Sequence, residues 1–308
     1  CGTMLTDAYG NQLTTSTGLA RDNYDIGVRA FLSANYGSEE AFSQAIEADP
    51  NFALAYVGLA RSFISSGKIT EAKTSLEKSK KFLGNVTDRE KSHFLCVDLA
   101  VSGAGKKAKN AVYQHVSSWP RDALIAQLNT SVFGLIGFSG EASREWDLLE
   151  YTEKLLPHYD NDWWMMSMHA ISLCETGQTF KSMELMEKSL NLNSRNANAA
   201  HFFAHILYEE NEVAAGREYL NAWMPSYDKR SLLHGHLSWH QALWALHDGD
   251  ESEMWSIIDS SISQENTSSL PINTLTDTAS IYHRAELAGF TVSKERWSQL
   301  SQFAAEKF

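Results

Sequence analysis

Apolar residues recur along this chain at the spacing of helices, and short polar turns separate the apolar segments. Val, Ile and Thr do not alternate with polar residues over any stretch that indicates a strand, and only five prolines occur in the 308 residues. Apolar positions three and four residues apart are typical of amphipathic helices, whereas strands alternate every second residue. The pattern therefore predicts an all-α chain of successive helices.

The clearest repeat lies at residues 51–81. A tetratricopeptide unit places a bulky residue, then Leu and a small residue, on its first helix, Gly in the turn and a small residue on its second helix. Here Tyr56 and Ala60 occupy the first segment, Gly67 the turn and Ala72 the second segment. Because the small side chains let two helices approach closely, we predict an antiparallel helix pair.

Further units follow with weaker patterns. Three helix pairs and a closing pair of helices are predicted at residues 162–193, 199–222, 236–262 and 275–308. Residues 87–157 are predicted to be helical but degenerate, with a loop at Gly134 to Gly140. A unit alone leaves much of its apolar surface exposed, so the units must stack. We predict a tetratricopeptide-like helical-repeat solenoid of stacked antiparallel helix pairs that forms one domain, residues 1–308.

The charge and the cysteines narrow the function classes. A net charge of -12 makes nucleic acid a poor partner, because the phosphate backbone would be repelled. No segment reaches the roughly 18 apolar residues that span a bilayer, and we see no secretory signal. Cys1, Cys96 and Cys174 are too few and too far apart for a disulfide framework, so we expect a cytoplasmic protein. We expect Met4 to be the natural start and Cys1 an added or processed residue.

Histidines are the main candidates for chemistry, since six of the eleven lie between residues 199 and 250. His201 and His205 are four residues apart, and Glu209 continues the row, so the three share one helix face. His236 and His240 repeat the spacing on the next unit. Imidazole and carboxylate groups suit a divalent transition metal or acid–base chemistry, while single histidines are often buried between packed helices. Two pairs in adjacent repeats favour a shared site.

Aromatic residues and one further histidine extend the candidate ligand-binding set. Trp163 and Trp164 are neighbours, and helical neighbours diverge by about 100°, so one of them is expected to line a groove. Trp239 precedes His240 and is expected to form an apolar wall. His169 occupies a packing position at which repeats usually carry an apolar residue.

Two charged residues near the end of the chain are further candidates for an ion pair or for the ligand-binding cavity. Asp277 and Arg284 are seven residues apart and share a helix face. We expect either an ion pair that fastens the terminal helices or a contribution to the ligand-binding cavity, and we favour the ion pair.

The chain resembles bacterial relatives of tetratricopeptide repeat protein 38 over nearly its whole length. The resemblance is strongest at residues 200–205 (AHFFAH) and 236–243 (HLSWHQAL), and it includes Asp277 and Arg284. It implies the repeat fold, a shared pocket, and roles for Glu175 and for an acidic residue after the second histidine. Some relatives carry that acid at the position of Tyr208, where Glu209 is the candidate in this chain. The resemblance implies no particular reaction.

Two functional hypotheses follow from these patterns. The first, which we favour, is a His-rich pocket between adjacent repeats that binds a small molecule or a divalent transition metal. The metal ligands would be His201, His205, His236 and His240. If the pocket is catalytic, the acting groups would be His205, His240, Glu209 or Glu175. The alternative is a non-enzymatic scaffold that binds a peptide or partner protein on its concave face, as other repeat proteins do.

Overall fold

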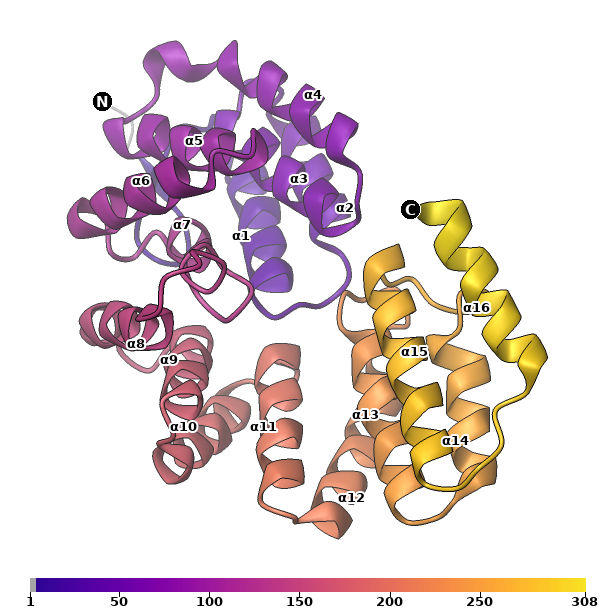
Figure 1. Cartoon of the computed structure of the whole chain (residues 1–308). Coiled ribbons are helices and arrows are strands. Elements are labelled where there is room, and N and C mark those ends of the chain that lie inside the picture. The colour runs from indigo at the N-terminus through magenta and orange to yellow at the C-terminus, as the bar shows by residue number, and fades with distance from the viewer. Residues whose placement is uncertain (1–3) are drawn as a thin grey trace. The chain divides into compact units, whose positions relative to one another are not determined.

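The structure, a computed structural model, describes residues 4–308, so the expectation about Cys1 falls outside the described residues. The chain divides into two compact units, Cys1–Ala199 and Ala200–Phe308, and each is described here by itself (Figure 1). The prediction of a single domain stays a prediction.

Among its described residues, the first unit contains a short hairpin, ten α-helices and two short 3-10 helices. Its elements are β1 (Leu5–Thr6), β2 (Gln12–Leu13), α1 (Gly18–Leu32), α2 (Ser38–Ala48), α3 (Ala53–Ser65), α4 (Ile69–Lys80), η1 (Leu83–Asn85), α5 (Asp88–Val101), α6 (Gly105–Ser118), α7 (Ala123–Gln127), α8 (Arg144–Leu155), η2 (Leu156–His158), α9 (Trp163–Glu175) and α10 (Thr179–Leu192).

The second unit is helical throughout its regular elements. These are α11 (Ala197–Glu209), which begins at the boundary, α12 (Val213–Trp223), η3 (Met224–Ser226), α13 (His234–His247), α14 (Glu251–Ile257), the π-helical turn η4 (Ile258–Ile262), α15 (Pro271–Leu287) and α16 (Lys294–Lys307).

Consecutive helices pack as antiparallel pairs, and small residues set their separation. Gly67 ends the turn between α3 and α4 with a φ of 76°, a left-handed conformation that glycine adopts without strain. On α4, the Ser75 hydroxyl donates to the Tyr56 carbonyl at 2.7 Å and the Ser79 hydroxyl to the Ala53 carbonyl at 2.9 Å. These buried hydroxyls find partners on the facing backbone only because the two helices lie close together.

The same combination of a glycine turn and a buried hydroxyl recurs in the pair α9 and α10. Gly177 forms the turn with a φ of 79°, and the Ser182 hydroxyl donates to the Ala170 carbonyl at 2.6 Å. Antiparallel helix pairs that carry tetratricopeptide-type residues at their contacts confirm the predicted all-α helical-repeat fold.

A glycine contact positions the first three helices. The ring of Phe42 on α2 lies between Gly27 of α1 and Gly58 of α3, and a Cβ atom at either glycine would come within 2.8 Å of it. The aromatic ring therefore fits only where both neighbouring helices lack a side chain.

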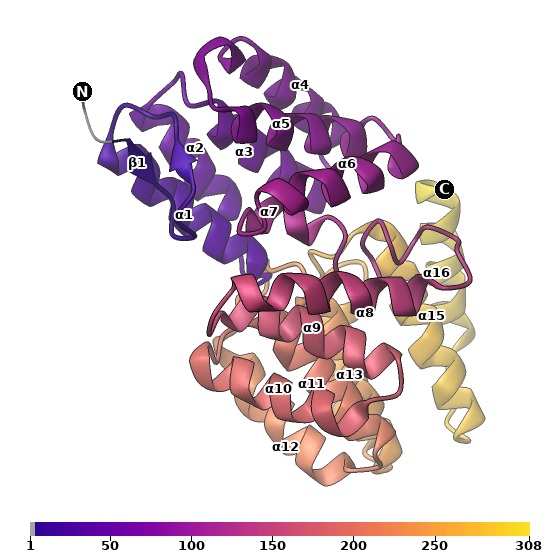
Figure 2. The same ribbon diagram turned by 90° about the vertical axis from the view of Figure 1, so that its left-hand side faces the viewer.

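The hairpin is the main difference from the predicted helical chain. Leu5 pairs with Leu13 in an antiparallel register, and the two-residue strands are too short to produce an alternating pattern in the sequence. The Asp7 carboxylate holds the turn by accepting the Tyr9 and Asn11 amides at 2.9 Å each. In Figure 2, β1 lies beside α1 in the first unit.

The degenerate region is helical with one interruption, as predicted. Between α7 and α8, residues 128–143 contain no regular helix, and this stretch includes Gly134 to Gly140. A capping box of Thr87 and Glu90 starts α5, because each side chain accepts the other's backbone amide.

The core of the second unit lies between α13, the turn η4, α15 and α16. The buried side chains Leu246, Ile258, Ile281 and Phe303 meet there. Their faces are apolar at helical spacing, so burial against one another orders the four elements. Among residues 4–308, no helix combines the length and the apolar character that a membrane span requires.

Candidate functional site

Four imidazoles from α11 and α13 converge in the second unit. The ring centre of His201 lies 4.7 Å from that of His236 and 5.2 Å from that of His240. His205 lies 5.1 Å from His240, and His236 lies 5.0 Å from His240. The two rows predicted from the sequence therefore face each other, and we call these four side chains the histidine cluster.

The cluster is buried on one side and open on the other. His201 is 5% exposed and His240 is 3% exposed, whereas the side chains of His205 and His236 are 45% and 34% exposed. Nε2 of His201 and both ring nitrogens of His240 have no hydrogen-bond partner among the described residues. A buried polar group without a partner costs about 1–3 kcal/mol, so these three nitrogens call for a partner.

Two carboxylates contact the outer imidazoles. Glu209 lies 3.3 Å from Nδ1 of His205, and Asp277 on α15 lies 3.2 Å from Nδ1 of His236. Since a carboxylate accepts, Nδ1 of His236 donates its N–H to Asp277. Asp277 thus orients the His236 ring, and Glu209 lies beside His205 at ion-pair distance.

Burial keeps the inner imidazoles neutral. Burial, followed by the charges of neighbouring imidazoles, holds the pKa of His201 well below its usual 6.5. The same causes, with burial again the largest, lower the pKa of His240. Neutral imidazole is the form that binds metal ions, so His201 and His240 are ready to act as ligands at neutral pH.

Three members of the cluster meet the distance requirement for a shared ion. One ring nitrogen each of His201, His205 and His240 lies within 4.8 Å of the others. Nitrogens bound to one tetrahedral ion at about 2.0–2.1 Å are roughly 3.4 Å apart, so closure needs small side-chain rotations. His236 is adjacent to this group but does not meet the distance requirement.

Trp239 and Arg284 form the wall next to His236. The Trp239 ring stacks on His236 with centroids 5.6 Å apart and planes 5° apart. The Arg284 guanidinium lies over Trp239, 5.7 Å from the ring centre. The ion pair expected between Asp277 and Arg284 is not formed among the described residues, because Asp277 accepts from His236 instead. Asp277 therefore contacts the histidine cluster through His236.

The other residues predicted to bind ligand belong to the first unit. Trp164 is fully buried, and its ring packs edge-on against Tyr159. His169 is 8% exposed, and its Nδ1 lies 2.8 Å from the Thr152 hydroxyl, so it bridges α9 and α8. Glu175 is exposed at the end of α9. A ligand could not reach Trp164 without repacking of the core.

Trp163 lines a surface cavity of about 460 Å³ in the first unit. Its walls also include Tyr9, Ile26, Arg29, Tyr159 and Asp162. The Arg29 guanidinium lies over the Trp163 ring, 5.2 Å from its centre. The expectation that one of the two adjacent tryptophans faces a groove therefore fits the geometry, and we call this space the Trp163 cavity.

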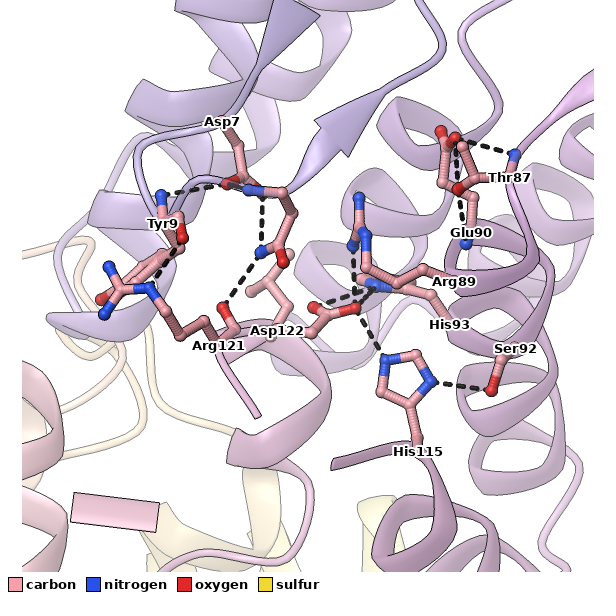
Figure 3. A network of polar contacts seen from close by, with 12 residues as sticks. Asp7, Tyr9, Thr87, Arg89, Glu90, Ser92, His93, His115, Arg121 and Asp122 are labelled. Atoms are coloured by element: carbon pink, nitrogen blue, oxygen red, sulfur yellow. Dashed lines mark hydrogen bonds and ion pairs between the residues drawn. The ribbon is translucent and has the colours of Figure 1, made fainter. Parts of the chain in front are cut away.

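A buried polar network around Asp122 escaped the sequence analysis (Figure 3). The Asp122 carboxylate accepts from Arg89 at 2.8 Å, from Nδ1 of His93 at 2.9 Å and from Nε2 of His115 at 2.8 Å. Burial alone would raise the pKa of Asp122, but His93, His115 and Arg89 outweigh burial and hold it well below 3.8. Arg89 and His93 are four residues apart on α5, a spacing that gave a signal for a shared face.

This network fastens the N-terminal segment to the helices. Arg89 also donates to the Gln12 carbonyl at 2.8 Å, and Thr14 donates through its backbone amide and hydroxyl to Glu90. Arg121 donates to the Tyr9 carbonyl at 2.8 Å. Every member thus has a packing or tethering role, and we interpret the Asp122 network as structural.

Solved repeat proteins are among the structures similar to this chain. No protein-family model matches the chain. A tetratricopeptide repeat protein from Parabacteroides merdae is similar, with 13% identity, a TM-score of 0.48, and coverage of 92% of this chain and 96% of that one. YrrB, described as a TPR protein with an unusual peptide-binding site, is 14% identical, with a TM-score of 0.32 and coverage of 73% and 92%. At these values the likeness concerns fold and not function.

Proposed function

We propose that the protein is a helical-repeat binding protein whose first unit holds a peptide segment of a partner in the Trp163 cavity. The observation that carries this proposal is the stacked pair of Trp163 and Arg29 at the wall of that cavity. Trp, Tyr and Arg are the residues that dominate binding energy at protein interfaces. The volume of the Trp163 cavity, about 460 Å³, is within the usual range for binding pockets.

Arg29 is the group that we expect to bind a peptide carboxylate. The wall of the cavity also carries Arg121 and the carboxylates of Asp25, Asp160 and Asp162. Asp162 already accepts the Tyr9 hydroxyl and the Met165 amide, and Asp25 accepts the Ala8 amide. Arg29, in contrast, forms no ion pair within 4.0 Å among residues 4–308. A ligand carboxylate would supply the partner of Arg29, and an adjacent apolar side chain would pack on Trp163 and Ile26.

The negative net charge of the chain does not prevent this. Surface charges more than about 8 Å apart are screened at physiological ionic strength, so the charges that line the cavity decide the interaction. We expect binding of an acidic peptide to weaken as salt rises.

Selection from a displayed random peptide library on the full chain tests the proposal. Enriched peptides should carry Asp, Glu or a free C-terminus next to an aromatic or aliphatic residue. Their affinity should fall at least tenfold for the Trp163→Ala and Arg29→Ala variants. Trp146→Ala and Arg144→Ala change residues of the same type on exposed positions of α8 and should bind as the unmodified protein does. Equal binding by all four variants would refute the proposal.

A peptide-binding scaffold is the second of the two hypotheses from the sequence. The similar solved structures are repeat proteins, one of them described with a peptide-binding site, which agrees with a scaffold at the level of fold. Membership of the tetratricopeptide repeat protein 38 family and a cytoplasmic location stay proposals that rest on the sequence alone.

A further inference from the structure

We infer that His201, His205 and His240 form a binding site for a divalent transition-metal ion, for which Zn²⁺ is the most suitable probe. This site lies entirely in the second unit and does not depend on peptide binding by the first. It goes beyond the proposed function because it gives the histidine cluster a role of its own.

The unpartnered nitrogens are the first argument. His201 and His240 are each more than nine-tenths buried, and together they carry three ring nitrogens that lack hydrogen-bond partners. One nitrogen of each of these rings lies within 4.8 Å of the other and of a nitrogen of His205. An ion that accepts one lone pair from each ring would supply a partner for one nitrogen of His201 and one nitrogen of His240.

The chemistry of the ligands selects the class of ion. Imidazole nitrogen suits Zn²⁺, Cu²⁺, Ni²⁺, Co²⁺ and Fe²⁺, whereas Mg²⁺ and Ca²⁺ require oxygen ligands. Three histidines with a fourth position left for water or another ligand form a known type of zinc site. The partly exposed side of His205 gives the ion a route of entry.

The surroundings prepare the ligands for the ion. Glu209 lies 3.3 Å from Nδ1 of His205, so Nε2 of this ring is the nitrogen left for the ion. Because α11 carries His201 and His205 one turn apart, both rings project from one face of one helix. α13 supplies His240.

His236 is the neighbour that extends the site. It lies within 5.0 Å of His201 and His240, centre to centre, and Asp277 fixes its tautomer. A rotation of its ring would make it a fourth ligand, while the three-ligand arrangement leaves that position open. The variants below distinguish these two forms.

Titration of tag-free protein with Zn²⁺ in a calorimeter, followed by Co²⁺ titration monitored by visible absorption, tests the inference. We expect one ion per chain. His205→Ala and His240→Ala should each weaken binding by at least about 100-fold, because loss of an outer-shell partner alone typically costs 10–100-fold. Glu209→Gln should weaken it by about tenfold on the same grounds. His236→Ala should weaken it as strongly as His205→Ala only if four rings bind.

The matched control is His247→Ala. His247 lies on α13, like His240, but it is exposed and outside the cluster, so binding should be unchanged. His205 is partly exposed, and circular dichroism should show that its variant folds. Absence of stoichiometric binding of Zn²⁺ or Co²⁺ at micromolar concentration would overturn the inference. Binding that survives both His205→Ala and His240→Ala would do so too, since it would place the ion elsewhere.

Discussion

Replacement of Asp122 by Asn should destabilise the first unit strongly. Asp122 is 3% exposed, and its carboxylate pairs with the buried guanidinium of Arg89 and accepts from the ring N–H groups of His93 and His115. The amide of Asn keeps one acceptor oxygen but turns an NH₂ group toward these donors. The variant therefore leaves a buried cation without its counter-charge.

The structure sets the size of this effect. Removing one partner of a buried ion pair costs about 3–5 kcal/mol, because the remaining charge stays desolvated. A domain is usually stable by about 5–15 kcal/mol, so the loss is a large fraction of the total. With a urea dependence of about 2–3 kcal/mol per molar for a unit of this size, the unfolding midpoint should fall by about 1–2 M.

Urea unfolding of the full chain at pH 7, followed by circular dichroism and tryptophan fluorescence, measures the shift. Asp22→Asn is the matched control, since Asp22 is 63% exposed in its side chain and pairs with Arg21 at the surface. Its midpoint should equal that of the unmodified protein. An Asp122→Asn midpoint within 0.3 M of the control, on the scale of the predicted shift, would refute the network as a source of stability.

The pH dependence gives an independent check on the same variant. The folded pKa of Asp122 is depressed, so its contribution is present above the unfolded value of 3.8 and is lost as pH falls through the folded pKa. The difference in stability between the unmodified protein and Asp122→Asn should therefore shrink below pH 4. A difference that grows on acidification would contradict the assigned charge state.

Three further predictions concern packing, reactivity and protonation. Gly58→Ala should cost about 1–3 kcal/mol, because the new Cβ would lie 2.5 Å from the Phe42 ring, and thermal unfolding should show partial rescue by Phe42→Leu. Burial raises the pKa of Cys96 to about 12, so its thiol should resist a disulfide reagent at pH 8 until urea unfolds the chain. The folded pKa values of His201 and His240 lie below 6.5, so these rings bind fewer protons in the folded than in the unfolded metal-free protein. The free energy of unfolding should therefore be constant above pH 6.5 and fall by about 1.4 kcal/mol per pH unit per histidine below it. Unfolding measured at pH 7.5 and 5.5 tests this. A His240→Leu variant should lose less on acidification, and equal losses would contradict this assignment.

The sequence predicts those parts of the fold that depend on local periodicity. Tyr56, Ala60 and Ala72 indicate the pair α3 and α4 because the pattern of one repeat is contained within about 34 residues. Local periodicity does not predict the hairpin at residues 5–13. Its strands have two residues each, and contacts with distant parts of the first unit, such as Arg89 with Gln12, hold it in place.

The candidate sites divide in the same way. His201 and His205, like His236 and His240, show their shared faces through spacing alone. Asp277 is indicated by its spacing from Arg284 and by the family resemblance. The meeting of His93, His115 and Asp122 depends on how α5, α6 and α7 pack, which spacing does not encode. Trp163 and Trp164 illustrate the intermediate case. Adjacency predicts that one ring turns outward, but only tertiary packing decides that Trp163 lines the cavity and Trp164 enters the core.

The most direct test of the metal site is an anomalous diffraction map at the zinc edge, from crystals of tag-free protein grown with Zn²⁺. The account predicts one peak per chain about 2.0–2.1 Å from a ring nitrogen of each of His201, His205 and His240. A map with no peak in the histidine cluster, or with zinc bound only elsewhere on the chain, would contradict it.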